Sequence, residues 1–483
     1  RSRQDRHYFV VIDSRPDPRS LPHSFSDLQI LYDNPKETVW KFVNNLRDRP
    51  YETTLSTFSK FSEYLLYRNP ETRPDEDVAD LFNQRLMETP TAVIKSSVEE
   101  EGYHVVGRSA LLPPRPVVCR GQPLSIQQWA SATDDEGRIS DVDSIKSIIF
   151  KGGVSPSLRY DVWKFLLGYY PWQSTNAERQ DLRKQKIEDY FRMKLQWRSM
   201  TAEQESRFSD FRERKSLIEK DVNRTDRTVP FFSGENNPNL VLLYDILMTY
   251  VMYNFDLGYV QGMSDLLSPI LSLMSNEADA FWCFVGFMDK VYRNFDMDQA
   301  GMKKQLSQLH TLLTAAGPDL SSYLDEHDSG NMFFCFRWLL VWFKREFSHD
   351  DIMTLWEVLW TGLPCSNFHL LVCVAILDTE KAIITDSNYG FTEILKHIND
   401  LSFKMNLEKL LCEAEAIYLQ LENAPNLTMS TKRVLGLAPD VSPTSTSSDD
   451  DSIVDASPDK PESESFTDDF EQGFERAITT NYY

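Results

Sequence analysis

Apolar residues between Ile145 and about Leu421 recur every three to four positions, which is the period of an α-helix that buries one face. Runs that alternate between apolar and polar residues, as in a half-buried β-strand, are scarce in this region. Segments with the clearest helical period are Asn239–Tyr253, Ala278–Phe295, Asn331–Phe347, Asp351–Leu359, Asn367–Asp378 and Leu407–Leu421. The pattern therefore predicts a mainly α fold with one all-helical domain over residues 145–425.

The first seventy residues have a different pattern. Residues 7–13 are rich in β-branched and aromatic side chains and read as a short strand, while residues 35–67 carry a helical period. One strand cannot make a sheet, and the sequence begins with Arg1 rather than Met. We therefore expect residues 1–70 to be the C-terminal part of a truncated N-terminal α+β domain.

Residues 71–144 read as a linker. They are acidic at first and then broken by prolines, as in Pro113-Pro114-Arg115-Pro116. Such a composition is typical of a polyproline II spacer. An inert spacer fits it better than a ligand for a proline-binding module.

Residues 426–483 are predicted to form a disordered acidic tail, because beyond Pro439 the chain is rich in Ser, Thr and Asp and has too few apolar residues to fold alone. The tail contains Phe466-x-Asp468-x-Phe470, which looks like short motifs that dock on endocytic adaptors. So short a pattern also arises often by chance.

Charge narrows the range of partners. The 483 residues include 73 acidic and 51 basic side chains, for a net charge of −22. Residues 71–150 account for −6 and the last 43 residues for −9, so the excess is concentrated in the predicted linker and tail. Such a chain repels phosphate backbones and anionic headgroups, and we expect neither a nucleic acid nor a lipid partner.

Cysteines and the longest uncharged run bear on the compartment. Six cysteines without a CxxC pair do not resemble a disulfide framework. The run Val358–Leu377 could span a bilayer if all of its 20 residues were apolar, but Gly362, Pro364 and polar residues interrupt its middle. Two buried helices around a turn are favoured, and we expect a cytoplasmic protein without a transmembrane segment.

Common catalytic and metal motifs are absent from the sequence. It contains no GxxxxGK, GxGxxG, GxSxG or HExxH. Cys365, His369 and Cys373 are spaced to share a helical face, but the run around them is apolar and offers no fourth ligand. A packed core face is therefore favoured over a metal site.

Two polar segments remain to be explained. In the first, Asp221 and Arg224 are three residues apart and would share a helical face, which by itself indicates only a solvated ion pair worth about 0–1 kcal/mol. In the second, Gly258–Asp265, two glycines flank an aromatic residue and an amide after an apolar helix. Alone, this is a turn before a helix that Ser264 or Asp265 would cap.

Together the two segments resemble the paired signature of TBC domains, which occur in GTPase-activating proteins of Rab GTPases. The signatures here are Ile218-x-x-Asp221-x-x-Arg224-Thr225 and Tyr259-x-Gln261-Gly262. Other blocks similar to the family follow in the family's order: Gly152-Gly153-Val154, Leu158-Arg159, Val162-Trp163-x-x-Leu166-Leu167-Gly168, Asp279–Phe284, Phe336–Leu339, Arg345-Glu346-Phe347 and Leu355-Trp356-Glu357. So many ordered blocks are far more specific than any one of them.

Within the family, the chain is most similar to the branch that contains members fifteen and seventeen. The resemblance to this branch extends through Pro50–Thr54, Phe58–Lys60, Tyr190–Trp197 and Phe391–Ile398. By analogy, the branch implies a late-endosomal Rab, a role in vesicle traffic, and recruitment to endosomal or mitochondrial membranes by adaptor proteins.

The resemblance also implies a mechanism. A Rab in its GTP form carries its own GTP and Mg²⁺, so the chain would need no cofactor or metal. Arg224 would be an arginine finger, and Gln261 a glutamine finger that replaces the Rab's switch glutamine. A guanidinium suits the developing phosphoryl charge, and an amide can orient water.

Supporting or Rab-binding roles are implied for Asp221, Thr225, Tyr259, Gly262 and Arg159, although core packing is also expected for Arg159. The alternative function is a non-catalytic Rab-binding scaffold or adaptor. Intact Arg224 and Gln261 argue against it.

Overall fold

The computed structural model describes residues 112–274, 276–296 and 298–438. Over this range the chain is helical, and its only β pairings are two isolated bridges, Leu124 with Val154 and Thr133 with Ile139. The prediction of a mainly α fold is confirmed. The predicted strand at 7–13, the helix at 35–67 and the motif at Phe466–Phe470 lie outside the described residues.

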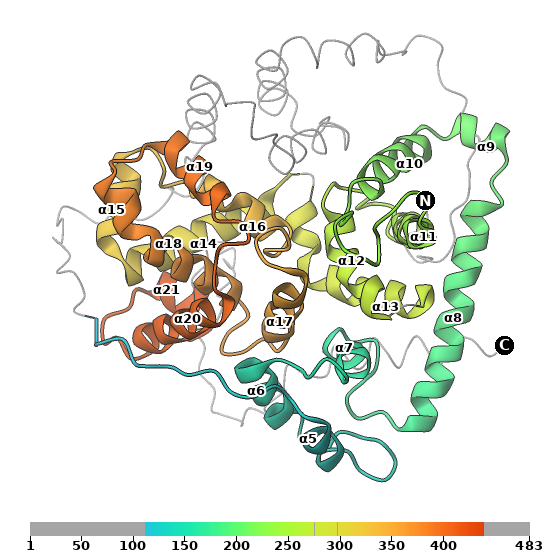
Figure 1. Ribbon diagram of the computed structural model, residues 1–483, viewed down its shortest axis with the longest axis horizontal. Helices are drawn as coiled ribbons and strands as arrows, with labels where there is room; N and C mark the ends of the chain where they lie inside the picture. The colour runs from blue at the N-terminus through green and yellow to red at the C-terminus, as the bar shows by residue number, and fades with distance from the viewer. Residues whose placement is uncertain (1–111, 275, 297, 439–483) are drawn as a thin grey trace, which may run out of the picture. The chain divides into compact units, whose positions relative to one another are not determined.

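The first half of the described chain runs from α5 to α13 (Figure 1). Its helices are α5 (Ile126–Ser131), α6 (Val142–Gly152), α7 (Arg159–Leu166), α8 (Asn176–Arg198), α9 (Ala202–Arg207), α10 (Ser209–Val222), α11 (Pro238–Tyr253), α12 (Met263–Met274) and α13 (Glu277–Val291). Nearly every side chain of α12 is buried, and α10, α11 and α13 pack around it. Residues at both ends of α12 are therefore positioned by the core of the fold.

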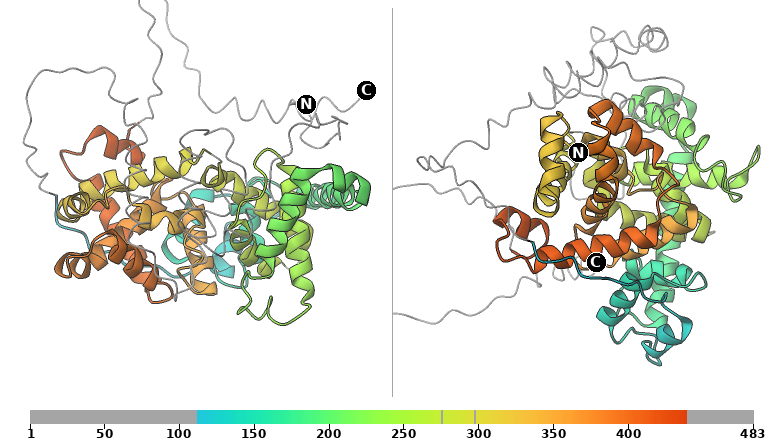
Figure 2. Two further views of the ribbon diagram at one scale, coloured as in Figure 1. Left: turned by 90° about the horizontal axis from the view of Figure 1, so that it is seen from above. Right: turned by 60° about the vertical axis from the view of Figure 1, so that its left-hand side comes forward.

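The second half follows a 3₁₀ turn, η2 (Tyr292–Phe295). Its elements are α14 (Ala300–Ala316), α15 (Pro318–Glu326), η3 (Phe333–Cys335), α16 (Phe336–Leu340), α17 (His349–Trp360), α18 (Phe368–Asp386), α19 (Phe391–Asp400), α20 (Leu407–Glu422) and α21 (Met429–Val434). The apolar helix α18 packs between α14 and α20, while α17 packs against α6 and α7 of the first half (Figure 2).

One predicted helix is wrong. Asn331–Phe347 is not continuous, because α16 ends at Leu340 and the backbone of Trp342 and Phe343 turns left-handed, with φ of 43° and 61°. Both aromatic side chains are buried within this turn, and burial gives a turn the same apolar pattern as a buried helix. By contrast, Val358–Leu377 does form parts of two helices around a turn, as predicted.

The helical unit extends beyond its predicted boundaries at both ends. Residues 112–124, which we call the strap, were assigned to the linker, yet they run along α20 (Figures 1 and 2). Arg115 donates to Asp378 at 2.7 Å and to Gln420 at 3.1 Å, and the Gln420 amide donates to the carbonyl of Pro113 at 2.8 Å. Composition indicated a spacer because the anchoring residues lie some 300 positions away.

At the other end, α21 falls within the predicted tail. Thr428 caps this helix, and Val434 and Leu435 are buried against the core. Among the described helices, none is both long enough and apolar enough to cross a membrane.

Candidate functional site

Arg224 lies directly beyond the C-terminus of α10. The helix ends at Val222, and the Arg224 N–H donates to the carbonyl of Asp221 at 3.1 Å. Its Nε donates to Asp221 Oδ1 at 3.1 Å, and 29% of the side chain is exposed. The helix end thus presents a guanidinium near the surface while a carboxylate orients its base.

Gln261 lies in the turn between α11 and α12. Gly258 and Gly262 flank its segment with φ of 70° and 101°, a left-handed conformation that glycine adopts without steric strain. The Gly262 N–H donates to Asp221 Oδ2 at 3.3 Å. Sequence alone suggested Ser264 or Asp265 as the cap of α12, but Ser264 donates to Asp221 and Asp265 pairs with Arg345.

Asp221 joins the two segments. Its carboxylate is only 1% exposed, and Oδ2 accepts hydrogen bonds from Tyr259 Oη, from the Gly262 N–H and, at 2.8 Å, from Ser264 Oγ. Thr225 Oγ1 lies 2.8 Å from the Asp221 carbonyl and 2.9 Å from Ser264 Oγ. Four side-chain and backbone donors thereby compensate the burial of one charge.

The structure thus brings together five residues that the resemblance singled out, and it buries a sixth beside them. Asp221, Arg224, Thr225, Tyr259 and Gly262 are linked by the bonds above. Ser264, which completes this cluster, was considered only as a helix cap. The hydroxyl spacing from Tyr259 to Ser264 carried no signal for a shared carboxylate.

The amide of Gln261 is buried without hydrogen bonds. The residue is 2% exposed, and neither Oε1 nor Nε2 has a hydrogen-bond partner among the residues that the structure describes. Native proteins satisfy the large majority of such groups, and leaving one unsatisfied costs about 1–3 kcal/mol. Gln261 is therefore held in an unfavourable state next to Asp221's cluster.

Arg159 belongs to a different polar cluster. It is buried, and its Nε donates to Glu357 Oε1 at 2.7 Å, the same oxygen that accepts from Trp163 Nε1 at 2.8 Å. The backbone N–H of Val154 donates to the other Glu357 oxygen. These bonds tie α7 to α17, so the contacts of Arg159 are structural ones.

Two further ion pairs flank the Asp221 cluster, and the sequence did not reveal them as pairs. Lys344 Nζ lies 2.9 Å from Asp226 Oδ1, and Arg345 Nη2 lies 2.8 Å from Asp265 Oδ2. Burial would raise the pKa of Asp226, but Lys344 and Ser268 outweigh it and hold this pKa below its usual value. Burial and the nearby Asp221 instead raise the pKa of Asp265 against the opposing effect of Arg345.

The Cys365, His369 and Cys373 side chains lie in the core. His369 Nε2 is 3.0 Å from Gln305 Oε1, its ring stacks on Trp342, and burial lowers its pKa to about 4. In the described ranges, no group of three or more His, Cys, Asp or Glu side chains could hold a metal ion.

Comparison with known proteins agrees with this geometry. The sequence model of the Rab-GTPase-TBC domain matches residues 156–385, which include both polar segments. Human TBC1 domain family member 17 is 47% identical over 447 residues, covering 92% of this chain and 66% of that protein. The GTPase-activating protein GYP7 of Yarrowia lipolytica is 40% identical over 358 residues, covering 69% and 48% respectively.

The chain thus spans just under two thirds of the length of human member 17. Among solved structures, the crystal structure of the Ypt/Rab-GAP domain of Gyp1p superposes with a TM-score of 0.54, covering 62% of this chain and 97% of that one. At 20% identity that likeness bears on the fold alone. Fold, signature segments and sequence relatives agree: the chain belongs to the Rab-GTPase-TBC domain family.

Proposed function

We propose that this protein accelerates GTP hydrolysis by a Rab-family GTPase, to which it supplies Arg224 and Gln261 in trans. The observation that carries the proposal is the arrangement around Asp221, which joins a partly exposed guanidinium and an unbonded amide. Membership of the TBC family supports it, as do relatives named as GTPase-activating proteins.

Arg224 suits the role of an arginine finger because it can leave Asp221 without stranding a buried charge. If the guanidinium moved to the γ-phosphate of a bound GTPase, Asp221 would keep its bonds from Tyr259, Gly262 and Ser264. An arginine at that position stabilises the charge of the transferring phosphoryl group and typically raises the rate by about 10³–10⁵. An exposed ion pair with Asp221 is worth only about 0–1 kcal/mol, so the exchange is favourable.

Gln261 suits the second role because its amide both donates and accepts hydrogen bonds, which is what orienting a water molecule requires. The side chain must turn outward to reach a partner, since it is almost fully buried here. Its unsatisfied amide makes that rotation cheap, because a bonded position on the partner would remove a penalty of about 1–3 kcal/mol. GTP and Mg²⁺ come with the Rab, so no cofactor of this chain enters the reaction.

Single-turnover GTP hydrolysis across a panel of Rab proteins tests the proposal. We expect wild type to accelerate at least one Rab, Arg224→Ala to lose about 10³-fold or more, and Gln261→Ala to lose a large part of the acceleration. Arg212→Ala is the matched control, because Arg212 is an exposed arginine on the same helix that bonds only neighbouring carbonyls in its printed contacts.

If Arg224→Ala and Gln261→Ala were as active as wild type, the two-finger mechanism would be wrong. If no Rab were accelerated but one bound tightly in its GTP form, the protein would be a Rab-binding scaffold instead. The burial of Gln261 is the one feature that favours this second function.

We further propose that the protein acts in vesicle and endosomal traffic, recruited to endosomal or mitochondrial membranes by adaptor proteins. The support is the similarity to human TBC1 domain family member 17, in line with the branch resemblance. Imaging of the tagged chain in cells, with and without candidate adaptors, tests this; uniform distribution under every condition would count against it.

A further inference from the structure

Two consecutive residues of one turn each hold one of the two finger segments. Lys344 pairs with Asp226, two residues after Arg224, and Arg345 pairs with Asp265, four residues after Gln261. We propose that Lys344 and Arg345, here called the brace, set the relative position of Arg224 and Gln261. The proposal rests on the proposed function and adds positioning residues to it.

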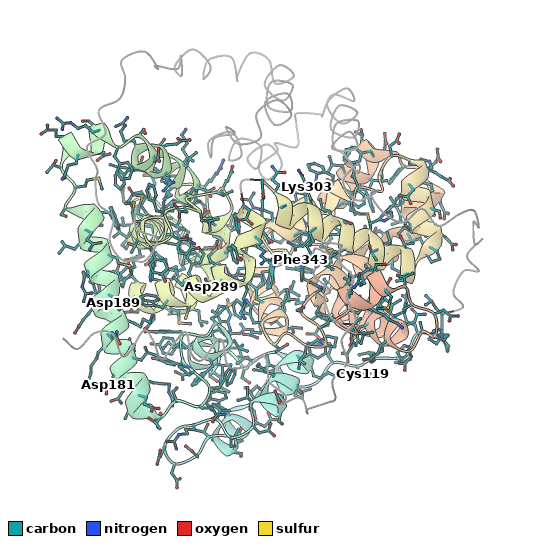
Figure 3. All side chains as sticks on the ribbon, turned by 180° about the vertical axis from the view of Figure 1, so that it is seen from behind. Cys119, Asp181, Asp189, Asp289, Lys303 and Phe343 are labelled. Carbon is teal, nitrogen blue, oxygen red and sulfur yellow. The ribbon has the colours of Figure 1, made fainter. Side chains whose placement is uncertain are left out.

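The turn that carries the brace is itself fixed. Trp342 and Phe343 hold left-handed backbone angles, which cost about 1–3 kcal/mol each and persist only where the surroundings enforce them. Figure 3 labels Phe343, whose N–H donates to the Trp338 carbonyl at 2.8 Å. Glu346, next to the brace, is fully buried and accepts two bonds of 2.8 Å from Arg337.

Both contacts of the brace are shielded from water. Side-chain exposure is 7% for Lys344 and 14% for Asp226, and it is 15% for Arg345 and 7% for Asp265. Separating such a pair leaves an uncompensated charge in a low-dielectric environment, which typically costs about 3–5 kcal/mol. The pairs therefore resist displacement far more strongly than a surface ion pair would.

The contact geometry is also directional. Arg345 contacts both oxygens of Asp265, with Nη2 at 2.8 Å and Nε at 3.3 Å. Asp226 is fixed from a second side by Ser268 Oγ at 2.6 Å, and Ser268 lies on α12 in the same helix as Asp265. The brace thus links the segment after Arg224, the helix after Gln261 and the turn after α16.

Such a link matters for rate more than for binding. The brace side chains are nearly buried, so they would act through the fingers and not by touching the GTPase. A displacement of about 1 Å at a reacting group can cost about 10²-fold in rate. Lys344 and Arg345 are accordingly positioning residues, and their removal would lower kcat while KM stays nearly constant.

The test is a paired substitution, Asp226→Asn with Lys344→Met, which removes both charges together and leaves neither one unpaired. We expect kcat on the best Rab to fall by about 10- to 100-fold with KM changed by less than about twofold. Arg345→Lys keeps the charge but loses the two-point contact, and we expect a smaller fall in kcat. Amide hydrogen exchange should also become faster at residues 223–228 in the paired variant.

The matched control is Asp245→Asn with Lys194→Met. That pair is also 2.9 Å long and buried, but it joins α8 to α11 and contacts neither finger segment. We expect this variant to keep the wild-type kcat even if its melting temperature falls. Arg345→Lys decides the matter if the paired brace variant does not fold.

Failure of the brace and failure of the proposed function give different results. A folded brace variant with kcat within about twofold of wild type and unchanged exchange at 223–228 would overturn the brace. If wild type accelerated no Rab, the proposed function would fail, and hydrogen exchange would still decide whether the brace orders the two segments: faster exchange supports it and unchanged exchange refutes it.

Discussion

Asp221→Ala removes the carboxylate on which both signature segments converge. Three buried donors lose their acceptor: the hydroxyl of Tyr259, the N–H of Gly262 and the hydroxyl of Ser264. Ser264 can turn to Thr225 Oγ1, 2.9 Å away, so two donors stay unsatisfied at about 1–3 kcal/mol each. With the lost charge pairing, we expect the free energy of unfolding to fall by about 3–5 kcal/mol.

Urea unfolding followed by tryptophan fluorescence measures this loss. Asp319→Ala is the control, because Asp319 also pairs with a cation, Lys381, but its side chain is 85% exposed, and we expect no measurable change. The midpoint should shift in Asp221→Ala without a change in slope. A loss below about 1 kcal/mol would refute the reasoning, since it would mean that the three donors find other acceptors at no penalty.

Two further predictions concern buried polar groups. Gln261→Met keeps the shape of the side chain and removes the unbonded amide, so we expect unfolding to require about 1–2 kcal/mol more while GTPase acceleration is lost; destabilisation in the same urea experiment would contradict this. For His369, burial lowers the pKa from 6.5 to about 4, so between those values the unfolded chain binds a proton that the folded chain does not, and stability falls as the pH falls. His369→Gln should flatten that part of the stability curve, and an unchanged slope would show that other groups dominate it.

The helices and the signature residues could be predicted from the sequence because both depend on local information. A helical period is visible within a dozen residues, and the spacing of Asp221 and Arg224 is visible within four. The pairing of Asp226 with Lys344 spans 118 positions, and nothing near either residue indicates the other. Long-range polar contacts of this kind are a property of the packed fold.

Two other features were missed for different physical reasons. Trp342 and Phe343 are buried in a turn, and an apolar pattern reports burial without distinguishing a turn from a helix. The burial of Gln261 was missed because a glutamine next to glycine is normally exposed and solvated, and only the surrounding core positions it out of water.

The strap has a consequence for synthesis of the chain. Arg115 and its acceptor Gln420 are separated by 305 positions. During translation at about 5–20 residues per second, roughly 15–60 s pass between the appearance of the strap and that of its docking site on α20. Over that interval Leu124 cannot complete its native surroundings, so the N-terminal edge of the helical unit closes last, after release of the segment that follows α18.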